Sequence, residues 1–241
     1  MLYSSINNQK IKDIKKLQQK KYRDLTNTFF IESEHLVEEA YKNGYLKELL
    51  LKEGTNIKLD IETNYLTEEV IKYITDLESP KNVMGICIKK EIKRIGNKVL
   101  ALDGIQDPGN LGTIIRSAVA FNIDTIILGN NCVDVYNSKV IRSSQGMIFN
   151  IEIVNGNLNE ILSGLKNNNY TIMGTKVDNG KDIRDINIPE KFVIVMGNEG
   201  NGMSDEITNV CDTFIYIKMN QNCESLNVGV ATSIILYEVN K

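Results

Sequence analysis

The second half of the chain alternates short apolar runs with amphipathic stretches, and this alternation restricts the fold more than any other feature of the sequence. The apolar runs contain few polar positions, so both faces of each strand are expected to be buried. Such strands, alternating with helices, predict an α/β domain with a parallel sheet covered by helices on both faces. We expect strands at 99–102, 125–128, 170–174, 192–196 and 214–217, and helices at 111–121, 137–144, 158–167, 204–210 and 225–239.

The first half predicts a smaller, mixed α/β domain over residues 1–96, followed by the larger domain over residues 97–241. Ile11, Ile14 and Leu17 recur at helical spacing, and a second helix from about 35 to 43 is expected to stop at Gly44. An apolar run at 49–51, a helix opened by Thr67, a strand at 83–88 and a polar linker at 89–97 follow.

Composition excludes a membrane-spanning protein and provides no obvious metal site. The chain is 42% hydrophobic and 24% charged, which is a globular composition, and no apolar stretch reaches the roughly 18 residues that a membrane span needs. The first residues lack the apolar core of a signal peptide, so a cytoplasmic protein is expected. Four dispersed cysteines and the single His35 do not form a zinc-binding pattern, and no metal is expected.

Charge is distributed unevenly along the chain. Residues 1–97 hold 17 lysines and arginines against 15 acidic residues, whereas residues 98–241 hold 11 against 16. The residues near the start form a local basic face, which consists of Lys10, Lys12, Lys15, Lys16, Lys20, Lys21 and Arg23. A basic face of this kind either meets phosphate groups or is a solvated helix surface, and charge alone favours the solvated surface.

Three clusters of polar residues follow strands of the second half, where parallel α/β sheets bind ligands. In the first cluster, Pro108 and Gly109 form a turn and Asn110 stands where a helix N-cap is expected. Asn110 could therefore have only a capping role. Arg116 lies among apolar residues of the next helix, so its cation must meet an anion or reach solvent, which favours a functional role.

The second cluster is a glycine-rich loop over residues 197–202. Its glycines let the backbone approach a ligand closely, and Ser204 is expected to start the next helix. No Lys-Ser/Thr pair follows, and the glycine spacing is not that of a dinucleotide-binding loop. Glu199 would repel a phosphate, so a non-phosphorylated ligand is favoured.

The third cluster spans residues 217–227, after the last strand. Ser225 is a candidate N-cap for the final helix, and Leu226, Val230 and Ile234 are expected on its buried side. The cap does not explain Asn227, and this cluster taken alone fits a structural role as well as a functional one.

Together the three clusters resemble the motifs of the SpoU family of RNA ribose 2'-O-methyltransferases, within the SPOUT class. The likeness covers the whole second half, and 137–146 is similar to the family's Arg-Ala/Ser-Ser-x-Gly segment. Residues 32–40 and 79–88 resemble, more weakly, the substrate-binding domain that precedes many SpoU domains. The three motifs correspond to Asn110-x5-Arg116, to Gly197-Asn198-Glu199-Gly200-Asn201-Gly202, and to Ile217-Lys218-Met219 with Ser225-Leu226-Asn227.

The resemblance implies a trefoil-knotted parallel-sheet domain, preceded by a domain with an L30e-like ribosomal-protein fold. It implies S-adenosylmethionine as the methyl donor, a homodimer formed through the C-terminal domain, and structured RNA as substrate, 23S-type ribosomal RNA ahead of transfer RNA. By this resemblance the cofactor is held by Gly197, Ile217, Met219 and Leu226, and the reacting ribose is surrounded by Asn110, Arg116, Glu199, Ser225 and Asn227.

The residue types agree with methyl transfer. An in-line displacement at a sulfonium needs a well-oriented hydroxyl and neither a metal nor a covalent intermediate. Because a guanidinium rarely loses its proton, Arg116 is expected to bind the adjacent phosphate and stabilise the developing alkoxide, and the proton acceptor is left open. Lys218 replaces the family's usual proline, and Ser33 stands where the N-terminal domain often has glycine. The alternative is a cofactor-binding or RNA-binding protein without turnover, such as a ribosome assembly factor.

Overall fold

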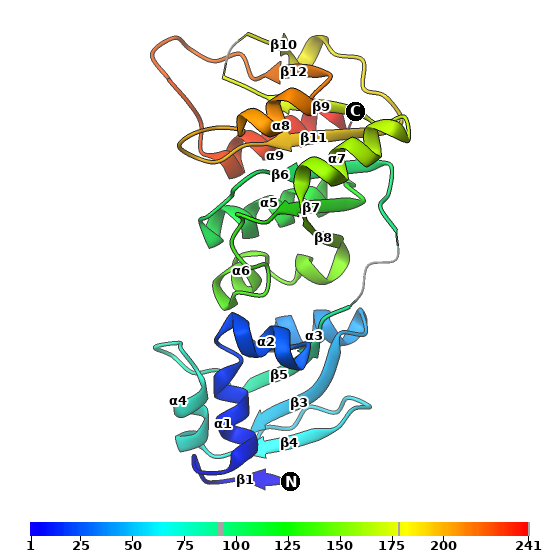
Figure 1. The fold of residues 1–241 in the computed structure, drawn as a ribbon. Coiled ribbons are helices and arrows are strands. Elements are labelled where there is room, and N and C mark those ends of the chain that lie inside the picture. Colours follow the sequence, from blue (N-terminus) through cyan, green and yellow to red (C-terminus); the bar gives the residue numbers. More distant parts are fainter. Residues whose placement is uncertain (91–93, 178, 241) are drawn as a thin grey trace. The chain divides into compact units, whose positions relative to one another are not determined.

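The computed structural model describes residues 1–90, 94–177 and 179–240, so the centre of the expected linker, residues 91–93, lies outside the described part. Two compact units are present (Figure 1). The first contains residues 1–90 together with 136–149, and the second contains residues 94–135 and 150–240. Residues 136–149 therefore pack within the first unit although the sequence places them inside the second half.

The first unit is built on a five-stranded mixed sheet in the order β1-β4-β3-β5-β2, in which β1, β4 and β3 are parallel and β5 is antiparallel to both its neighbours. Its strands are β1 (Leu2–Tyr3), β2 (Thr28–Glu32), β3 (Leu46–Lys52), β4 (Thr63–Leu66) and β5 (Val83–Ile88). Its helices are α1 (Gln9–Lys16), α2 (Lys20–Thr26), α3 (Glu34–Lys42), α4 (Glu68–Ile74), α6 (Ser138–Ser143) and the 3-10 turn η1 (Met147–Asn150).

Helices α1, α3 and α4 confirm the helical patterns read from the first half. Ile11 and Ile14 of α1 and Val70 of α4 are buried in one apolar cluster, and Gly44 ends the α3 region with a φ of +68°. Elements α2, β1, β2 and β4 were not predicted from the sequence. The sequence of α2, Lys20–Thr26, has no apolar periodicity, because only Arg23 is buried there.

The basic face predicted near the start is largely neutralised within the first unit. Arg23 is buried and donates hydrogen bonds from Nη1 to the carbonyl oxygens of Leu17 and Gln18, each 2.8 Å away, so it caps the end of α1. Four lysines form ion pairs, which supports the solvated-surface alternative. The pairs are Lys10 with Glu48 at 2.7 Å, Lys15 with Asp76 at 3.3 Å, Lys16 with Asp13 at 2.8 Å and Lys20 with Asp24 at 2.6 Å.

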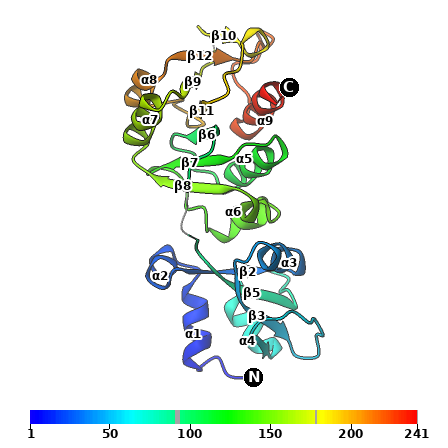
Figure 2. The ribbon, with the colours of Figure 1, turned by 90° about the vertical axis from the view of Figure 1, so that its right-hand side faces the viewer.

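The second unit contains the predicted parallel sheet, in the order β10-β12-β9-β11-β6-β7-β8 with every pair parallel. Helices lie on both faces, with α5 and α9 on one side and α7 and α8 on the other (Figure 2). The strands are β6 (Lys98–Leu102), β7 (Thr125–Gly129), β8 (Glu152–Gly156), β9 (Thr171–Thr175), β10 (Lys181–Asp182), β11 (Phe192–Met196) and β12 (Thr213–Tyr216). The helices are α5 (Pro108–Ala120), α7 (Leu158–Asn167), α8 (Asp205–Val210), α9 (Val228–Val239) and the 3-10 turn η2 (Ile183–Asp185).

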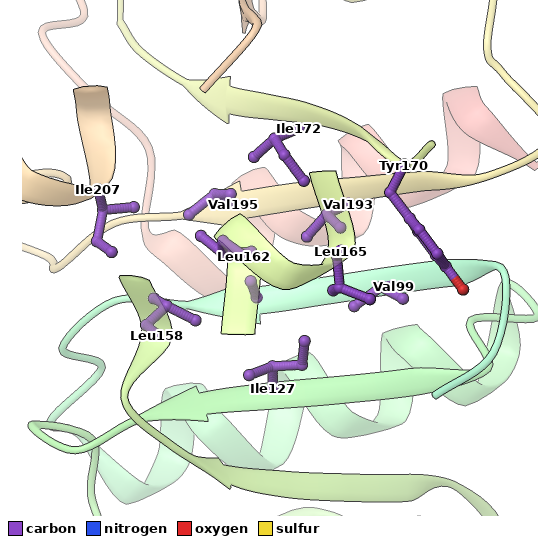
Figure 3. Packing of buried hydrophobic residues seen from close by; sticks show 11 residues of the cluster. Val99, Ile127, Leu158, Leu162, Leu165, Tyr170, Ile172, Val193, Val195 and Ile207 are labelled. Carbon is purple, nitrogen blue, oxygen red and sulfur yellow. The ribbon is translucent and has the colours of Figure 1, made fainter. Parts of the chain in front are cut away.

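The core beneath α7 and α8 is continuous across the central strands. Leu158, Leu162 and Leu165 of α7 pack on Val99 and Val193 of the sheet (Figure 3). All five residues of β11 are buried, as their unbroken apolar sequence predicts. Strands β8 and β10 were not predicted, because they lie at the two edges of the sheet and their residues are only partly buried or exposed.

The final helix differs from the prediction in its start and in its buried face. Helix α9 begins at Val228, not at 225, and its N-cap is Asn227 instead of Ser225. Val230 and Ile234 are 47% and 36% exposed, so their expected burial is wrong. The helix instead turns small residues toward α5, where a Cβ on Gly229 would lie 3.2 Å from Thr113. The side chains that it buries are those of Val228, Thr232, Ile235, Leu236 and Val239.

Candidate active site

The start of α5 is shaped by Pro108, and this placement frees Asn110 for other contacts. Proline suits the first turn of a helix, so the N-cap falls on Asp107, which accepts a hydrogen bond from the backbone N–H of Asn110 at 2.9 Å. The expectation that Asn110 is the N-cap is therefore wrong. Its side chain instead donates from Nδ2 to Oε1 of Glu199 at 3.0 Å.

Asn227, Asn110 and Glu199 form one directional chain of hydrogen bonds. Oδ1 of Asn227 accepts from the backbone N–H groups of Gly229 and Val230, at 2.9 and 3.3 Å, which turns its Nδ2 toward Oδ1 of Asn110 at 2.9 Å. Asn110 then donates to Glu199. Every link donates toward the carboxylate, so the backbone N–H groups at the start of α9 determine the orientation of both amides.

The glycine-rich loop after β11 is closed by its own backbone. Asn198 and Gly202 exchange two hydrogen bonds of 2.9 and 3.0 Å, and Gly202 has a φ of +70°. A Cβ on Gly197 would lie 2.2 Å from the carbonyl carbon of Gly202, so only glycine fits at position 197.

Asn198, which the sequence analysis did not single out, organises this loop. Its Oδ1 accepts from the backbone N–H groups of Gly200 and Asn201 at 2.9 and 3.2 Å. Its Nδ2 lies 2.8 Å from the carbonyl oxygen of Gly104 and 3.3 Å from Oε2 of Glu199. Its side chain therefore joins the loops after β6 and β11. In the sequence, only its position between Gly197 and Glu199 of the glycine-rich loop could have indicated this role.

Asp103 is a second residue that sequence reasoning missed. It follows β6, and its Oδ2 accepts hydrogen bonds from the backbone N–H and the hydroxyl of Ser204, at 2.7 and 2.9 Å. Ser204 is the N-cap position of α8, as expected, but its hydroxyl bonds to Asp103 and not to its own helix. An acidic residue directly after a strand could have indicated that its carboxylate accepts hydrogen bonds from the start of a neighbouring helix.

A cavity of about 480 Å³ opens beyond the carboxyl ends of β9, β11 and β12. All four residues expected to hold the cofactor line it, namely Gly197, Ile217, Met219 and Leu226. Glu199 and Ser225, two of the five residues expected around the ribose, also line it. The last connection to α9, which forms one wall, is the orange segment after β12 in Figure 1.

Asn110 and Asn227 do not line the cavity but are linked to it through Glu199. Arg116, in contrast, lies further along α5 with its side chain in solvent, and within the described residues it forms no ion pair. From the sequence, the Arg116 cation was expected either to meet an anion or to reach solvent, and in the described residues it reaches solvent. Lys218 is also exposed, and the structure brings neither cation into the cavity wall.

Among the described residues, no three His, Cys, Asp or Glu side chains gather as they would around a metal ion. In the same part of the chain, no helix has the length and apolar character needed to cross a membrane. All four cysteines are unbridged.

Comparison with known proteins identifies both halves of the chain. Residues 97–237 match the SpoU rRNA Methylase family, and residues 8–85 match the MRM3-like substrate binding domain. A Bacillus subtilis protein named 23S rRNA (guanosine(2553)-2'-O)-methyltransferase RlmP is 42% identical over 241 residues, which covers 98% of this chain and 97% of that protein.

Solved structures agree with the sequence matches over nearly the whole chain. The AdoMet-bound rRNA methyltransferase from Sinorhizobium meliloti superposes with a TM-score of 0.88 at 29% identity, covering 99% of this chain and 97% of that one. A putative RNA methyltransferase of the TrmH family from Porphyromonas gingivalis gives a TM-score of 0.88 at 28% identity, covering 98% of each chain.

Proposed function

The chain belongs to the SpoU rRNA methylase family, and we propose that it methylates the ribose 2'-hydroxyl of one nucleotide in 23S-type ribosomal RNA. The enzyme class expected from the three motifs, an RNA 2'-O-methyltransferase that uses S-adenosylmethionine, is confirmed. The choice of ribosomal RNA is supported by the name of the B. subtilis relative and by the substrate-binding domain matched at residues 8–85. The observation that carries the site assignment is the hydrogen-bonded chain from Asn227 through Asn110 to Glu199 at the cavity.

The cavity fits S-adenosylmethionine. Its volume of about 480 Å³ lies within the range of small-molecule sites. Its wall combines glycine backbone at Gly197 with the side chains of Ile217, Met219 and Leu226, which suits an adenine ring and the carbon chain of the methionine part. When bound, S-adenosylmethionine supplies an electrophilic methyl group on a positively charged sulfur. The carboxylate of Glu199 in the cavity wall would stabilise this positive charge electrostatically.

Residues at the edge of the cavity orient the ribose. The two amide donors on Glu199 leave free lone pairs on its carboxylate, which can accept a hydrogen bond from a ribose hydroxyl. Ser225 lines the same cavity and offers a hydroxyl. The Arg116 guanidinium, exposed and without an ion pair among described residues, is available to bind the adjacent RNA phosphate and to stabilise the developing alkoxide.

The exposed face of α9 supports a homodimer formed through the C-terminal domain. Val230, Ile234 and Tyr237 are 47%, 36% and 61% exposed on this helix. Tyr237 lies against Phe121 of the α5 region, with ring centroids 5.9 Å apart. Grouped apolar side chains on a surface mark interaction sites, and a second copy of the same face would cover them.

Three further features belong to the proposal. A trefoil knot in the second unit is supported by the segment after β12, which returns past β9 and β11 to place α9 against α5. The first unit, with a mixed sheet between α3 and the α1–α4 pair, is proposed to have the L30e-like fold and to bind RNA. We also propose a cytoplasmic location, because the proposed substrate is ribosomal RNA.

The function is tested in two steps. Calorimetric titration of the full chain with S-adenosylmethionine is expected to show binding, and the absence of binding at millimolar ligand would exclude the enzyme. Mapping of 2'-O-methyl groups in total RNA from a deletion strain is then expected to show the loss of one modification in 23S ribosomal RNA. Cofactor binding with an unchanged modification map would instead favour the binding protein without turnover.

A further inference from the structure

The cavity wall carries two charged side chains among its described residues, and they have opposite signs. Lys176 follows β9 and Glu199 follows β11. These two strands are neighbours in the sheet, with Ile194 opposite Met173. The proposed mechanism uses Glu199 but gives no role to Lys176.

Lys176 is held by the strands on both sides. Its backbone N–H donates to the carbonyl oxygen of Ile215 at 3.0 Å, and the hydroxyl of the preceding Thr175 donates to the carbonyl oxygen of Val195 at 2.8 Å. The ammonium nitrogen lies 3.8 Å from the ring centroid of Phe214. This cation–π contact positions the charge without neutralising it.

Two other cations near these strands are paired with carboxylates. Lys166 lies 2.7 Å from Asp212, and Arg184 lies 2.5 Å from Asp182. Among the described residues, Lys176 has no such anion. The ammonium group of the exposed Lys176 therefore has no carboxylate partner among the described residues, and it can meet an anionic group of a ligand at the cavity.

The charges of the methyl donor indicate which group this is. S-adenosylmethionine carries a positive sulfonium, a positive ammonium group and one carboxylate, so a lysine in the wall repels the ligand unless it faces the carboxylate. We propose that Lys176 binds the carboxylate of the methionine part of S-adenosylmethionine, with Glu199 on the positively charged side of the ligand. This inference rests on the proposed function, since it assumes that this cavity is the methyl-donor site.

Decarboxylated S-adenosylmethionine provides the test, because it keeps the adenosine, sulfonium and ammonium groups and lacks only the carboxylate. Calorimetric titration of the full wild-type chain is expected to show tighter binding of S-adenosylmethionine than of the decarboxylated compound. Lys176→Ala is expected to weaken S-adenosylmethionine binding roughly tenfold, as for the loss of one charge-assisted hydrogen bond. Its affinity for the decarboxylated compound should stay equal or rise, because a repulsive charge is removed.

Two variants serve as controls. Lys181→Ala removes an exposed lysine of β10 that does not line the cavity, and it should leave both affinities unchanged. Lys176→Arg keeps the positive charge and should retain most of the preference for the carboxylated ligand. Circular dichroism of each variant checks that the fold is intact.

The alternative partner of Lys176 is an RNA phosphate. A variant that loses affinity for a ribosomal RNA fragment while binding S-adenosylmethionine like the wild type would overturn the inference and favour that partner. An equal loss for both forms of the methyl donor would also overturn it and assign Lys176 a packing role. If the wild-type chain binds neither form, the proposed function itself fails.

Discussion

Asn227 donates a hydrogen bond from its Nδ2 to Oδ1 of Asn110, 2.9 Å away, although the two residues are 117 positions apart in the chain. This contact links the start of α9 to the start of α5 and, through Asn110, to Glu199. One asparagine therefore combines two roles, because its other amide atom caps α9.

Asn227→Asp separates these two roles. The carboxylate can still accept hydrogen bonds from Gly229 and Val230, so we expect the melting temperature to change little. It cannot donate to Asn110, so we expect single-turnover methyl transfer to fall about a hundredfold, by loss of orientation at Glu199. Asn227→Ala should lose activity and also about 1 kcal/mol of stability with the cap. Full activity in the aspartate variant would contradict a role for the hydrogen-bonded chain.

Arg116→Lys tests the guanidinium. The side chain is exposed, so the free energy of unfolding and the affinity for S-adenosylmethionine should match the wild type. Lysine keeps the charge but not the planar fork, and we expect methyl transfer at saturating RNA to fall between about tenfold and a hundredfold. Single-turnover rates measure this, with Arg116→Ala as the more severe case. Full retained turnover with intact binding would count against any role for the geometry of the guanidinium.

Gly197→Ala should disrupt the loop after β11. The added Cβ would lie 2.2 Å from the carbonyl carbon of Gly202 and 2.3 Å from the backbone nitrogen of Met203, so the loop must open and S-adenosylmethionine binding should be lost. Gly164→Ala is the matched control. No heavy atom lies within 4 Å of its new Cβ on α7, so this change should stabilise the protein by about 0.5–1 kcal/mol and leave binding unchanged. Calorimetry and thermal unfolding measure both effects.

The cysteines should differ strongly in reactivity toward a thiol reagent. Cys223 is exposed, whereas burial raises the pKa of the Cys211 thiol to about 11 and also raises the pKa of the Cys132 thiol and of the buried Cys87 thiol. Because the thiolate is the reactive form, these three cysteines stay protonated near pH 8 and should react slowly. We therefore expect one fast thiol in the native protein, and Cys223→Ser should remove it. A fast phase that survives this substitution would contradict the assignment.

Ile234→Glu should break the proposed dimer. The residue is 36% exposed on α9, so a charge there should cost the isolated fold little but should oppose association of two apolar faces. Sedimentation velocity is expected to show a dimer for the wild type and a monomer for the variant. Leu25→Glu changes an apolar residue of the first unit that is 76% exposed, and it should leave the dimer intact. Equal sedimentation of all three proteins would exclude this face as the interface.

The sequence by itself determined the α/β class and the five inner strands of the second unit. The apolar runs that became β6, β7, β9, β11 and β12 are specified by burial on both faces, and that requirement is visible in the amino acids alone. The motif glycines were also readable, since Gly197 has no room for a side chain. Residues that must be apolar or must be glycine are determined locally, so the pattern of the chain reveals them.

Only the tertiary structure decided which polar side chains meet. Asn110 and Ser225 were both expected to be caps, but Pro108 moved one cap to Asp107 and the start of α9 moved the other to Asn227. The contacts of Asp103 with Ser204 and of Asn198 with Gly104 likewise join loops about a hundred residues apart. A hydrogen bond depends on distance and direction between atoms that the fold brings together, and neither quantity is encoded in local residue spacing. Val230 and Ile234 were assigned to the wrong face of α9 for a similar reason. Which face of an apolar helix is buried depends on the elements that pack against it, and the tertiary structure decides this.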